Sequence, residues 1–205
     1  MSPRPRKASD DEVFAAATRM MARCGPGDLT LAMIASEAGL TAGALVQRFG
    51  SKRALLLALA ERFATSTEHL FAGLRASSRS PLAALRAYAT CMAGLGTSAT
   101  ALANSLSWLQ QDLTDPDFRR YTQTQARASR RELQRLAEDA VADGEIDAHV
   151  DPAALARAIE VTVSGSLMSW AIHQEGTCRD WVRHDLEMLL KPHLPPRRAK
   201  ARKKR

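Results

Sequence analysis

The 205-residue sequence contains no run that approaches the roughly 20 consecutive apolar residues of a membrane-spanning helix. Its first basic residues are followed by Asp10, Asp11 and Glu12 instead of an apolar segment, which does not fit a secretory signal peptide. We therefore expect a cytoplasmic protein that has no membrane partner.

Cysteine is also scarce, and the three cysteines, Cys24, Cys91 and Cys178, are far apart and form no CxxC pair. The five histidines form no HExxH pattern, so neither disulfides nor a metal site is expected. The sequence also lacks GxSxG, GxGxxG and Walker motifs, so nothing in it supports an enzyme or a bound cofactor. We predict a protein that is not an enzyme and has no cofactor.

What the sequence does contain is positive charge, with a formal net charge of +7 that is concentrated at both ends. Ten of the 29 basic residues lie in residues 1–7 and 197–205, which leaves 19 basic residues against 22 acidic ones in between. The ends therefore look like cationic arms on a mildly acidic body. Charge of this kind suits nucleic acid, anionic lipid or an acidic protein, and does not choose among them.

Helical signals occur throughout, whereas β-branched alternation is almost absent and aromatic residues make up only 5% of the chain. Ser9 with Glu12 fits a capping box, and Thr30, Thr41 and Ser51 each suit a helix N-cap. The long helix that Ser51 begins is expected to bury Leu55, Leu59, Phe63, Leu70 and Leu74. Ser80-Pro81, Asp115-Pro116 and Asp151-Pro152 each place a capping side chain before a proline, and Gly144 and Gly176 suit helix ends.

These signals predict an all-α fold of about nine helices in two domains. A basic arm (1–8) precedes a helix-turn-helix domain (9–53), and a connecting helix (52–77) leads into a larger helical domain (54–194). The tail (195–205) ends in RRAKARKKR, which has no apolar residue beyond two alanines and cannot pack, so the tail is expected to be disordered.

Residues 30–49 have the spacing of a helix-turn-helix. Ile34, Ala38, Leu40 and Leu45 are apolar where two short helices meet, and Gly39 suits the tight turn between them. The polar side of the second helix would be free to enter a major groove. An αα-hairpin that serves packing alone has the same local pattern.

From residue 15 to residue 59 the chain resembles the tetracycline-repressor (TetR) family of bacterial regulators. The resemblance rests on AAATRMMARCG, on LAMIASEAGLTAGALVQRFGSK after a threonine, and on RALLLALAERF. It implies a DNA-binding N-terminal domain and a C-terminal domain that binds an effector and dimerises. In place of a frequent basic residue and a usual tyrosine of the family, this chain has Ala42 and Val46.

The resemblance also implies which residues bind DNA. Gln47 is expected to contact an adenine edge, Arg48 a guanine edge or a phosphate, and Lys52 a phosphate. Val46 either contacts a thymine methyl group or packs, and the arm with Arg4 and Arg6 either enters the minor groove or is a solvated terminus. The full expected set is Arg4, Arg6, Thr30, Thr41, Ala42, Gly43, Ala44, Val46, Gln47, Arg48 and Lys52.

Helices after residue 152 are expected to form a two-fold dimer, as in TetR-like proteins, through apolar residues at helical spacing. Packing within their own protomer is the alternative. The expected interface consists of Leu155, Ile159, Val163, Ser166, Leu167, Trp170, Trp181, Leu186 and Leu189.

The middle helices would enclose a pocket for an unknown hydrophobic small-molecule effector, although the same residues also suit an ordinary core. Between Pro116 and Asp147, six arginines are balanced by seven acidic residues, which predicts a solvated helix face with ion pairs. The expected pocket residues are Tyr88, Cys91, Met92, Leu106, Trp108, Tyr121 and His173.

Together these features predict a ligand-responsive regulator, a repressor, that binds a palindromic operator in double-stranded DNA as a homodimer. Two alternatives remain open: a helical protein-interaction module without operator specificity, and a helical enzyme that acts on a hydrophobic substrate.

Overall fold

The structure, a computed structural model, describes residues 8–195. The expected arm with Arg4 and Arg6 and nearly all of the tail lie outside these residues. Within them the fold is all-α, with nine α-helices and a short 3-10 turn and without strands. The helices are α1 (Asp10–Arg23), α2 (Leu31–Glu37), α3 (Ala42–Phe49), α4 (Lys52–Ser77), α5 (Pro81–Ala93), α6 (Ala99–Thr114), α7 (Pro116–Ala142), α8 (Pro152–His173) and α9 (Cys178–Leu190), and the turn is Lys191–His193.

Side-chain caps set where these helices begin. Ser9 and Glu12 form the reciprocal capping box of α1. The hydroxyl of Ser51 accepts from the amide of Ala54 at the start of α4, and α5, α7 and α8 each begin with the predicted capped proline. The helix ends differ in one place from expectation. Helix α8 has its C-cap at Gln174, which has positive φ (54°), and Gly176, two residues later, has positive φ as well (64°).

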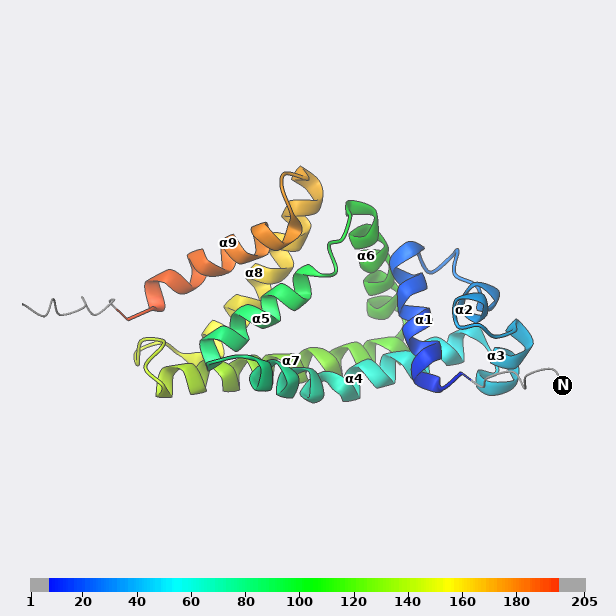
Figure 1. The fold of residues 1–205 in the computed structure, drawn as a ribbon, viewed down its shortest axis with the longest axis horizontal. Coiled ribbons are helices and arrows are strands. Elements are labelled where there is room, and N and C mark those ends of the chain that lie inside the picture. Colours follow the sequence, from blue (N-terminus) through cyan, green and yellow to red (C-terminus); the bar gives the residue numbers. More distant parts are fainter. Residues whose placement is uncertain (1–7, 196–205) are drawn as a thin grey trace, which may run out of the picture.

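The long helices α4 and α7 lie side by side and connect the two ends of the molecule (Figure 1). Helices α1, α2 and α3 gather at one end, whereas α5, α8 and α9 pack together at the other. A core of 23 buried residues, among them Phe71, Leu133 and Ile159, holds α4, α5, α7, α8 and α9 together. A second core, with Ile34, Leu45 and Leu55 among its members, holds α1 to α4 together.

The prediction for the buried face of α4 is only half right. Leu55 and Leu59 are buried, but Phe63 and Leu70 are 37% and 39% exposed. Phe71 is fully buried in their place, because the buried face turns where α4 leaves the N-terminal core and packs on α7.

The N-terminal core is completed by two side chains from the C-terminal half of the chain. Trp108 on α6 and Phe118 on α7 are 5% and 4% exposed and pack among the residues of α1 to α4. The indole N–H of Trp108 is within 3.2 Å of the carbonyl of Met21 and 3.1 Å of that of Cys24, and the Asn104 amide donates to Ala22 (3.2 Å). Helix α6 therefore satisfies carbonyls at the C-terminus of α1 that the helix itself leaves without donors.

Candidate DNA-binding surface

Helices α2 and α3 form the predicted helix-turn-helix. The Thr30 and Thr41 hydroxyls accept from the amides of Met33 and Ala44 at 3.2 Å and so cap the two helices. Gly39, at φ +68°, makes the turn between them, which an L side chain would strain. Both threonine hydroxyls keep a proton that can be donated to a phosphate.

Helix α3 has one side toward the core and one side toward solvent. Leu45 is fully buried, and at 100° per residue Gly43 and Gln47 lie on the opposite side of the helix. Both are exposed, and Val46 beside them is 48% exposed. Ala42 and Ala44 are half-buried at the edges of this face. We call Gly43, Val46 and Gln47 the outward face of α3.

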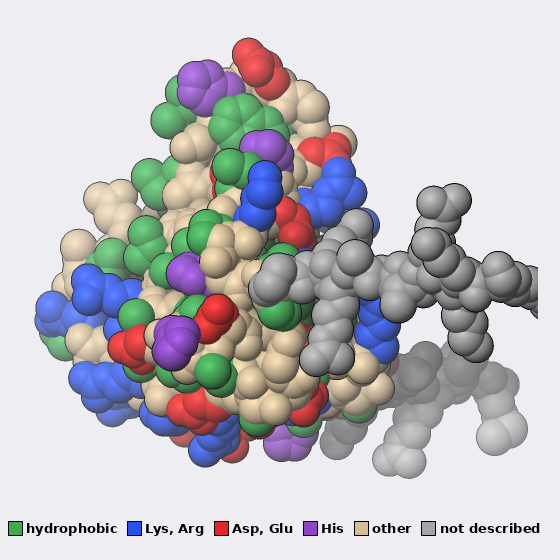
Figure 2. Space-filling view, turned by 90° about the vertical axis from the view of Figure 1, so that its left-hand side faces the viewer, with side chains coloured by type: hydrophobic (Ala, Val, Ile, Leu, Met, Phe, Trp, Pro, Cys, Tyr) green, Lys and Arg blue, Asp and Glu red, His purple; other side chains and the backbone are tan. Residues whose placement is uncertain are grey.

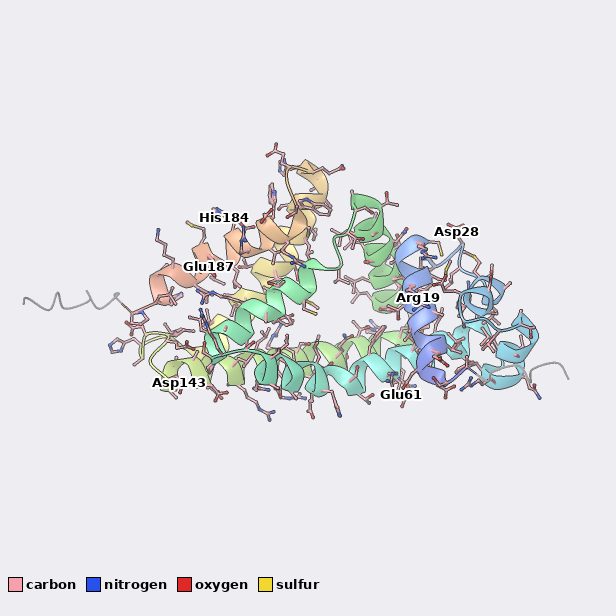
Figure 3. All side chains as sticks on the ribbon, in the orientation of Figure 1. Arg19, Asp28, Glu61, Asp143, His184 and Glu187 are labelled. Atoms are coloured by element: carbon pink, nitrogen blue, oxygen red, sulfur yellow. The ribbon has the colours of Figure 1, made fainter. Side chains whose placement is uncertain are left out.

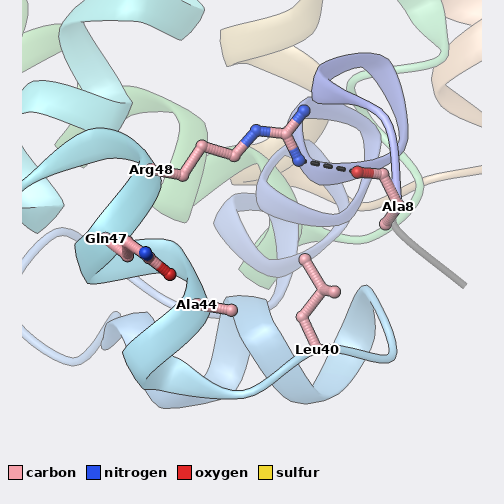
Figure 4. Close-up of a pocket in the computed structure, with 5 residues that line it drawn as sticks. All are labelled: Ala8, Leu40, Ala44, Gln47 and Arg48. Atoms are coloured by element: carbon pink, nitrogen blue, oxygen red, sulfur yellow. Dashed lines mark hydrogen bonds between the residues drawn. The ribbon is translucent and has the colours of Figure 1, made fainter. Parts of the chain in front are cut away.

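Arg48 does not point away from the protein with this face. One of its Nη atoms donates to the carbonyl of Ala8 at 2.6 Å (Figure 4). The guanidinium is also ion-paired with Asp10. It also lies 5.6 Å from the centre of the Phe49 ring. The expected contact of Arg48 with a base or a phosphate stays a prediction, and it would require Arg48 to exchange these partners.

A pocket lies between α3 and the start of α1, with a volume of about 440 Å³. Ala8, Leu40, Ala44, Gln47 and Arg48 line it (Figure 4). Ala8, the first described residue, therefore lies directly beside α3. Neither Ala8 nor Asp10 was expected at this site, because only the fold brings residues 40 positions apart into contact.

Lys52 is also engaged within the domain. Its ammonium group donates to the carbonyls of Pro26 (3.1 Å) and Leu29 (2.8 Å) and so ties the loop between α1 and α2 to the start of α4. An ammonium group has three protons, so one remains for the phosphate contact that the sequence predicts.

The remaining cations of residues 8–62 have acidic partners. Arg19 on α1 (Figure 3) and Arg23 bind Glu37 on α2 at 2.6 and 3.1 Å. The hydrogen bond from Arg19 is the main reason that the pKa of Glu37 lies below its ordinary value. Arg53 contacts Asp115 and Asp117 at 3.0 and 2.8 Å, and Arg62 contacts Asp11 at 2.8 Å.

The N-terminal domain is therefore electrically neutral without its arm. Residues 8–62 contain six basic and six acidic side chains. Each of the six basic ones has an acidic or a carbonyl partner within the described part of the chain. No basic side chain of residues 8–62 is therefore without a partner, and Arg4, Arg6 and Lys7, which precede this segment in the sequence, lie outside the described residues.

Two of the six arginines of α7, Arg130 and Arg135, form ion pairs of the kind that the sequence predicts. Arg130 contacts Glu160 on α8 at 2.5 Å, and Glu132, which is buried, binds both Arg75 and Arg135 at 2.5 Å. Basic and acidic side chains are interspersed on the end of the molecule opposite the N-terminal domain (Figure 2). This face is therefore not a second surface of one charge.

The seven residues expected around an effector do not converge on one cavity. Tyr88 is buried and stacks on Phe71 at 5.3 Å, and burial raises its pKa to about 12, whereas Trp108 belongs to the other core. His173 is exposed and stacks on Trp181 at 5.6 Å. Cys91 is exposed, Met92 and Tyr121 are half-buried, and Leu106 is 40% exposed.

Of the seven predicted effector residues, only Leu106 lines an apolar groove. This groove lies between α6 and α8 and has a volume of about 480 Å³. The sequence did not point to this groove, because apolar residues on α6 and α8 are equally consistent with burial in a core. The other lining residues are Ala99, Thr100, Ala103, Met168, Ala171 and Ile172.

Most of the predicted dimer residues pack inside their own protomer, and their place in an interface stays a prediction. Of the nine, Trp181 and Leu189 are half-buried, and the other seven are at most 8% exposed. Six of these seven belong to the C-terminal core. The seventh, Ser166, donates a hydrogen bond to Asp185 of α9 at 2.6 Å. The buried seven are Leu155, Ile159, Val163, Ser166, Leu167, Trp170 and Leu186.

Other apolar side chains of α8 and α9 face solvent. On α8, Val161, Met168 and Ile172 are 62%, 51% and 76% exposed, and Met188 on α9 is 56% exposed. We call these four residues the α8–α9 apolar stripe. Their spacing on α8, seven and then four residues, is a helical repeat that the sequence contains.

Neither a membrane-spanning helix nor a metal site is found in the described part of the chain. No helix of residues 8–195 is long and apolar enough to cross a membrane. Among the same residues no three His, Cys, Asp or Glu side chains are grouped closely enough to hold a metal ion.

Solved structures share this fold over nearly the whole chain. NemR of E. coli in its reduced form has a TM-score of 0.72 at 19% identity and covers 91% of this chain and 98% of its own. SmeT, the repressor of the Stenotrophomonas maltophilia efflux pump SmeDEF, has a TM-score of 0.64 at 22% identity and covers 92% of both chains. FadR of Bacillus subtilis in complex with stearoyl-CoA has a TM-score of 0.64 at 18% identity, with coverage of 89% and 98%.

No curated protein matches the chain in sequence. Two family models do match it. Residues 13–59, which contain α2, α3 and the start of α4, match the model described as bacterial regulatory proteins of the tetR family. Residues 109–186 match the tetracyclin repressor-like C-terminal domain. The exposed helix-turn-helix, the nine-helix architecture and both matches agree: the chain belongs to the TetR family of DNA-binding transcriptional regulators, a family without enzymatic function.

Proposed function

We propose that the protein binds a palindromic operator as a homodimer through α3 and represses transcription until a hydrophobic small molecule binds the C-terminal domain. The observation that carries the proposal is the outward face of α3. It is exposed, it lies on a rigidly capped helix-turn-helix, and it belongs to a chain of a DNA-binding family. A two-fold dimer would present two such helices about 34 Å apart, to successive major grooves.

Selection of bound duplexes from a random pool tests this proposal. We expect a palindromic motif, and we expect Gln47→Ala to change the preferred base at one position per half-site, at a cost of about 1–3 kcal/mol, because Gln47 is the exposed amide of the outward face. Circular dichroism melting serves as the control, since an exposed side chain should not affect folding. A pool that yields no palindrome would argue for a protein-interaction module instead.

The proposed dimer interface is the α8–α9 apolar stripe. Its four apolar side chains are exposed on two neighbouring helices, and a four-helix interface between two protomers forms by burying side chains of this kind. Gly165 lies on the same side of α8 as Val161, and a Cβ atom there would meet nothing within 4 Å. A partner helix could therefore approach the backbone of α8 closely.

Val161→Glu is expected to weaken the dimer by about tenfold or more, because a carboxylate would be buried on each side of the interface. Sedimentation velocity over a range of concentrations measures the effect. Leu113→Glu on α6 is the matched control, since Leu113 is similarly exposed (52%) but lies outside the stripe. Equal self-association of Val161→Glu and the unchanged protein would remove the stripe from the interface.

The proposed effector site is the apolar groove between α6 and α8, which shares Met168 and Ile172 with the α8–α9 apolar stripe and would therefore border the proposed dimer interface. SmeT has been solved with triclosan and FadR with stearoyl-CoA, and both ligands are hydrophobic. Helix α6 contributes Leu106 to the groove, and its Trp108 and Asn104 hold the C-terminus of α1. A ligand that displaces α6 would therefore change the position of the helix-turn-helix, and the difference in its affinity for the two conformers would set the strength of the response.

A further inference from the structure

We infer that α3 recognises its half-site chiefly through thymine methyl groups, with Val46 as the main contact. The inference rests on the proposed operator binding and names the base chemistry that the operator must have. It follows from the side chains on the outward face of α3, from the partners of those beside it, and from the pattern of groups in a major groove.

Val46 is available for this contact because its side chain is exposed to solvent. It is 48% exposed and is not among the residues of either core. At 100° per residue it lies about 100° from Leu45 and about 60° from Gly43, on the exposed flank of α3. Gly43, on the same side, has no side chain, so the helix backbone can approach the base edges closely.

Few polar side chains remain to compete with Val46. Arg48 is bonded to Ala8 and Asp10. The Thr41 hydroxyl caps the start of α3 and keeps its proton for a phosphate. Among the described residues of α3, the one polar side chain on the outward face is therefore Gln47. The amide of Gln47 suits the N6 and N7 atoms of adenine.

In the major groove, the thymine C5-methyl is the apolar group that a base pair presents, whereas guanine and cytosine present hydrogen-bonding groups. Val46 against those groups would remove water from them without supplying a partner, which is unfavourable. Against thymine, the valine and the methyl group bury apolar surface on both sides. The outward face thus favours half-sites in which thymine lies beside an adenine that Gln47 contacts.

The test uses the full chain and the operator obtained by selection, with deoxyuridine in place of one thymine at a time. Deoxyuridine pairs as thymine does but lacks the methyl group. At the thymine that Val46 contacts, we expect affinity to fall about fourfold per half-site, and about sixteenfold when both half-sites are changed, as measured by fluorescence anisotropy at constant salt. A loss below about twofold at every thymine would overturn the inference.

Val46→Ala distinguishes a methyl contact from a change in DNA shape. A shape effect would persist in this variant, whereas a contact with Val46 would largely disappear, so the deoxyuridine penalty should fall below about twofold. Leu113→Ala, which removes a similarly exposed side chain on α6, should retain the full penalty. Equal penalties in all three proteins would contradict the role of Val46.

Operator binding and the recognition of thymine by Val46 can be disproved separately. A selection that returns no palindrome overturns the proposed function and the inference with it. A palindrome that tolerates deoxyuridine throughout leaves operator binding intact and overturns only the recognition of thymine by Val46.

Discussion

Replacement of Arg4, Arg6 and Lys7 by alanine is expected to weaken operator binding by about a hundredfold or more at physiological salt. Residues 8–62 have no net charge, and their six cations are already engaged within the protein. Ala8, the first described residue, lies beside α3, and the cations Arg4, Arg6 and Lys7 precede it in the sequence. Neutralisation of phosphates supplies much of the affinity of a protein for DNA.

The salt dependence of binding gives the sharper measurement. Two arms contain six cations per dimer, so their removal should reduce the slope of log K against log salt by up to about five. Alanine at Arg119, Arg127 and Arg131, three exposed arginines of α7, is the control with the same change in charge. An unchanged slope in the arm variant would mean that Arg48 and Lys52 exchange their protein partners for phosphates.

Trp108→Ala is expected to lower the free energy of unfolding by about 3–5 kcal/mol, as large-to-small changes of buried aromatic residues do. Trp108 is 5% exposed and, although it lies on α6, it packs in the core formed by α1 to α4. Its indole N–H also donates to the carbonyls of Met21 and Cys24 at the end of α1. The loss should therefore appear in the N-terminal domain, although the substitution is in α6. Urea unfolding followed by circular dichroism measures it.

Trp108→Phe separates the hydrogen bonds from the packing. It keeps an aromatic ring but leaves the carbonyls of Met21 and Cys24 without that donor, at an expected cost of about 1–3 kcal/mol. Leu113→Ala on the same helix is expected to cost little, because Leu113 is 52% exposed. Comparable losses for Leu113→Ala and Trp108→Ala would show that α6 does not support the N-terminal domain.

The sequence predicted the helices well because their ends depend on local chemistry. A capping side chain and a proline at the first turn act over three or four residues, and these are contiguous in the chain. Thr30, Thr41, Ser51 and Asp151 all cap the helices that the sequence assigned to them. The exception, Gln174 in a left-handed conformation, is a residue type that gives no such signal.

The sequence did not predict which side of a helix faces a neighbour. Helix α8 is apolar on both sides, so the helical repeat that contains Ile159 and the one that contains Val161 were equally plausible interfaces. Packing on α5, α7 and α9 buries the first side and exposes the second. The groove between α6 and α8 was not predicted for the same reason: the sequence does not show which apolar side chains of these helices are exposed.

By itself, then, the amino-acid sequence determined the helix boundaries, the helix-turn-helix and the family, because each depends on residues that are close together in the chain. Only the tertiary structure decided that Asp10 pairs with Arg48, that two loop carbonyls bind Lys52 and that Trp108 completes the N-terminal core. Each of these contacts joins residues more than 20 positions apart. Such contacts form only when helices pack, and no local pattern specifies which distant partner a charge or a ring will meet.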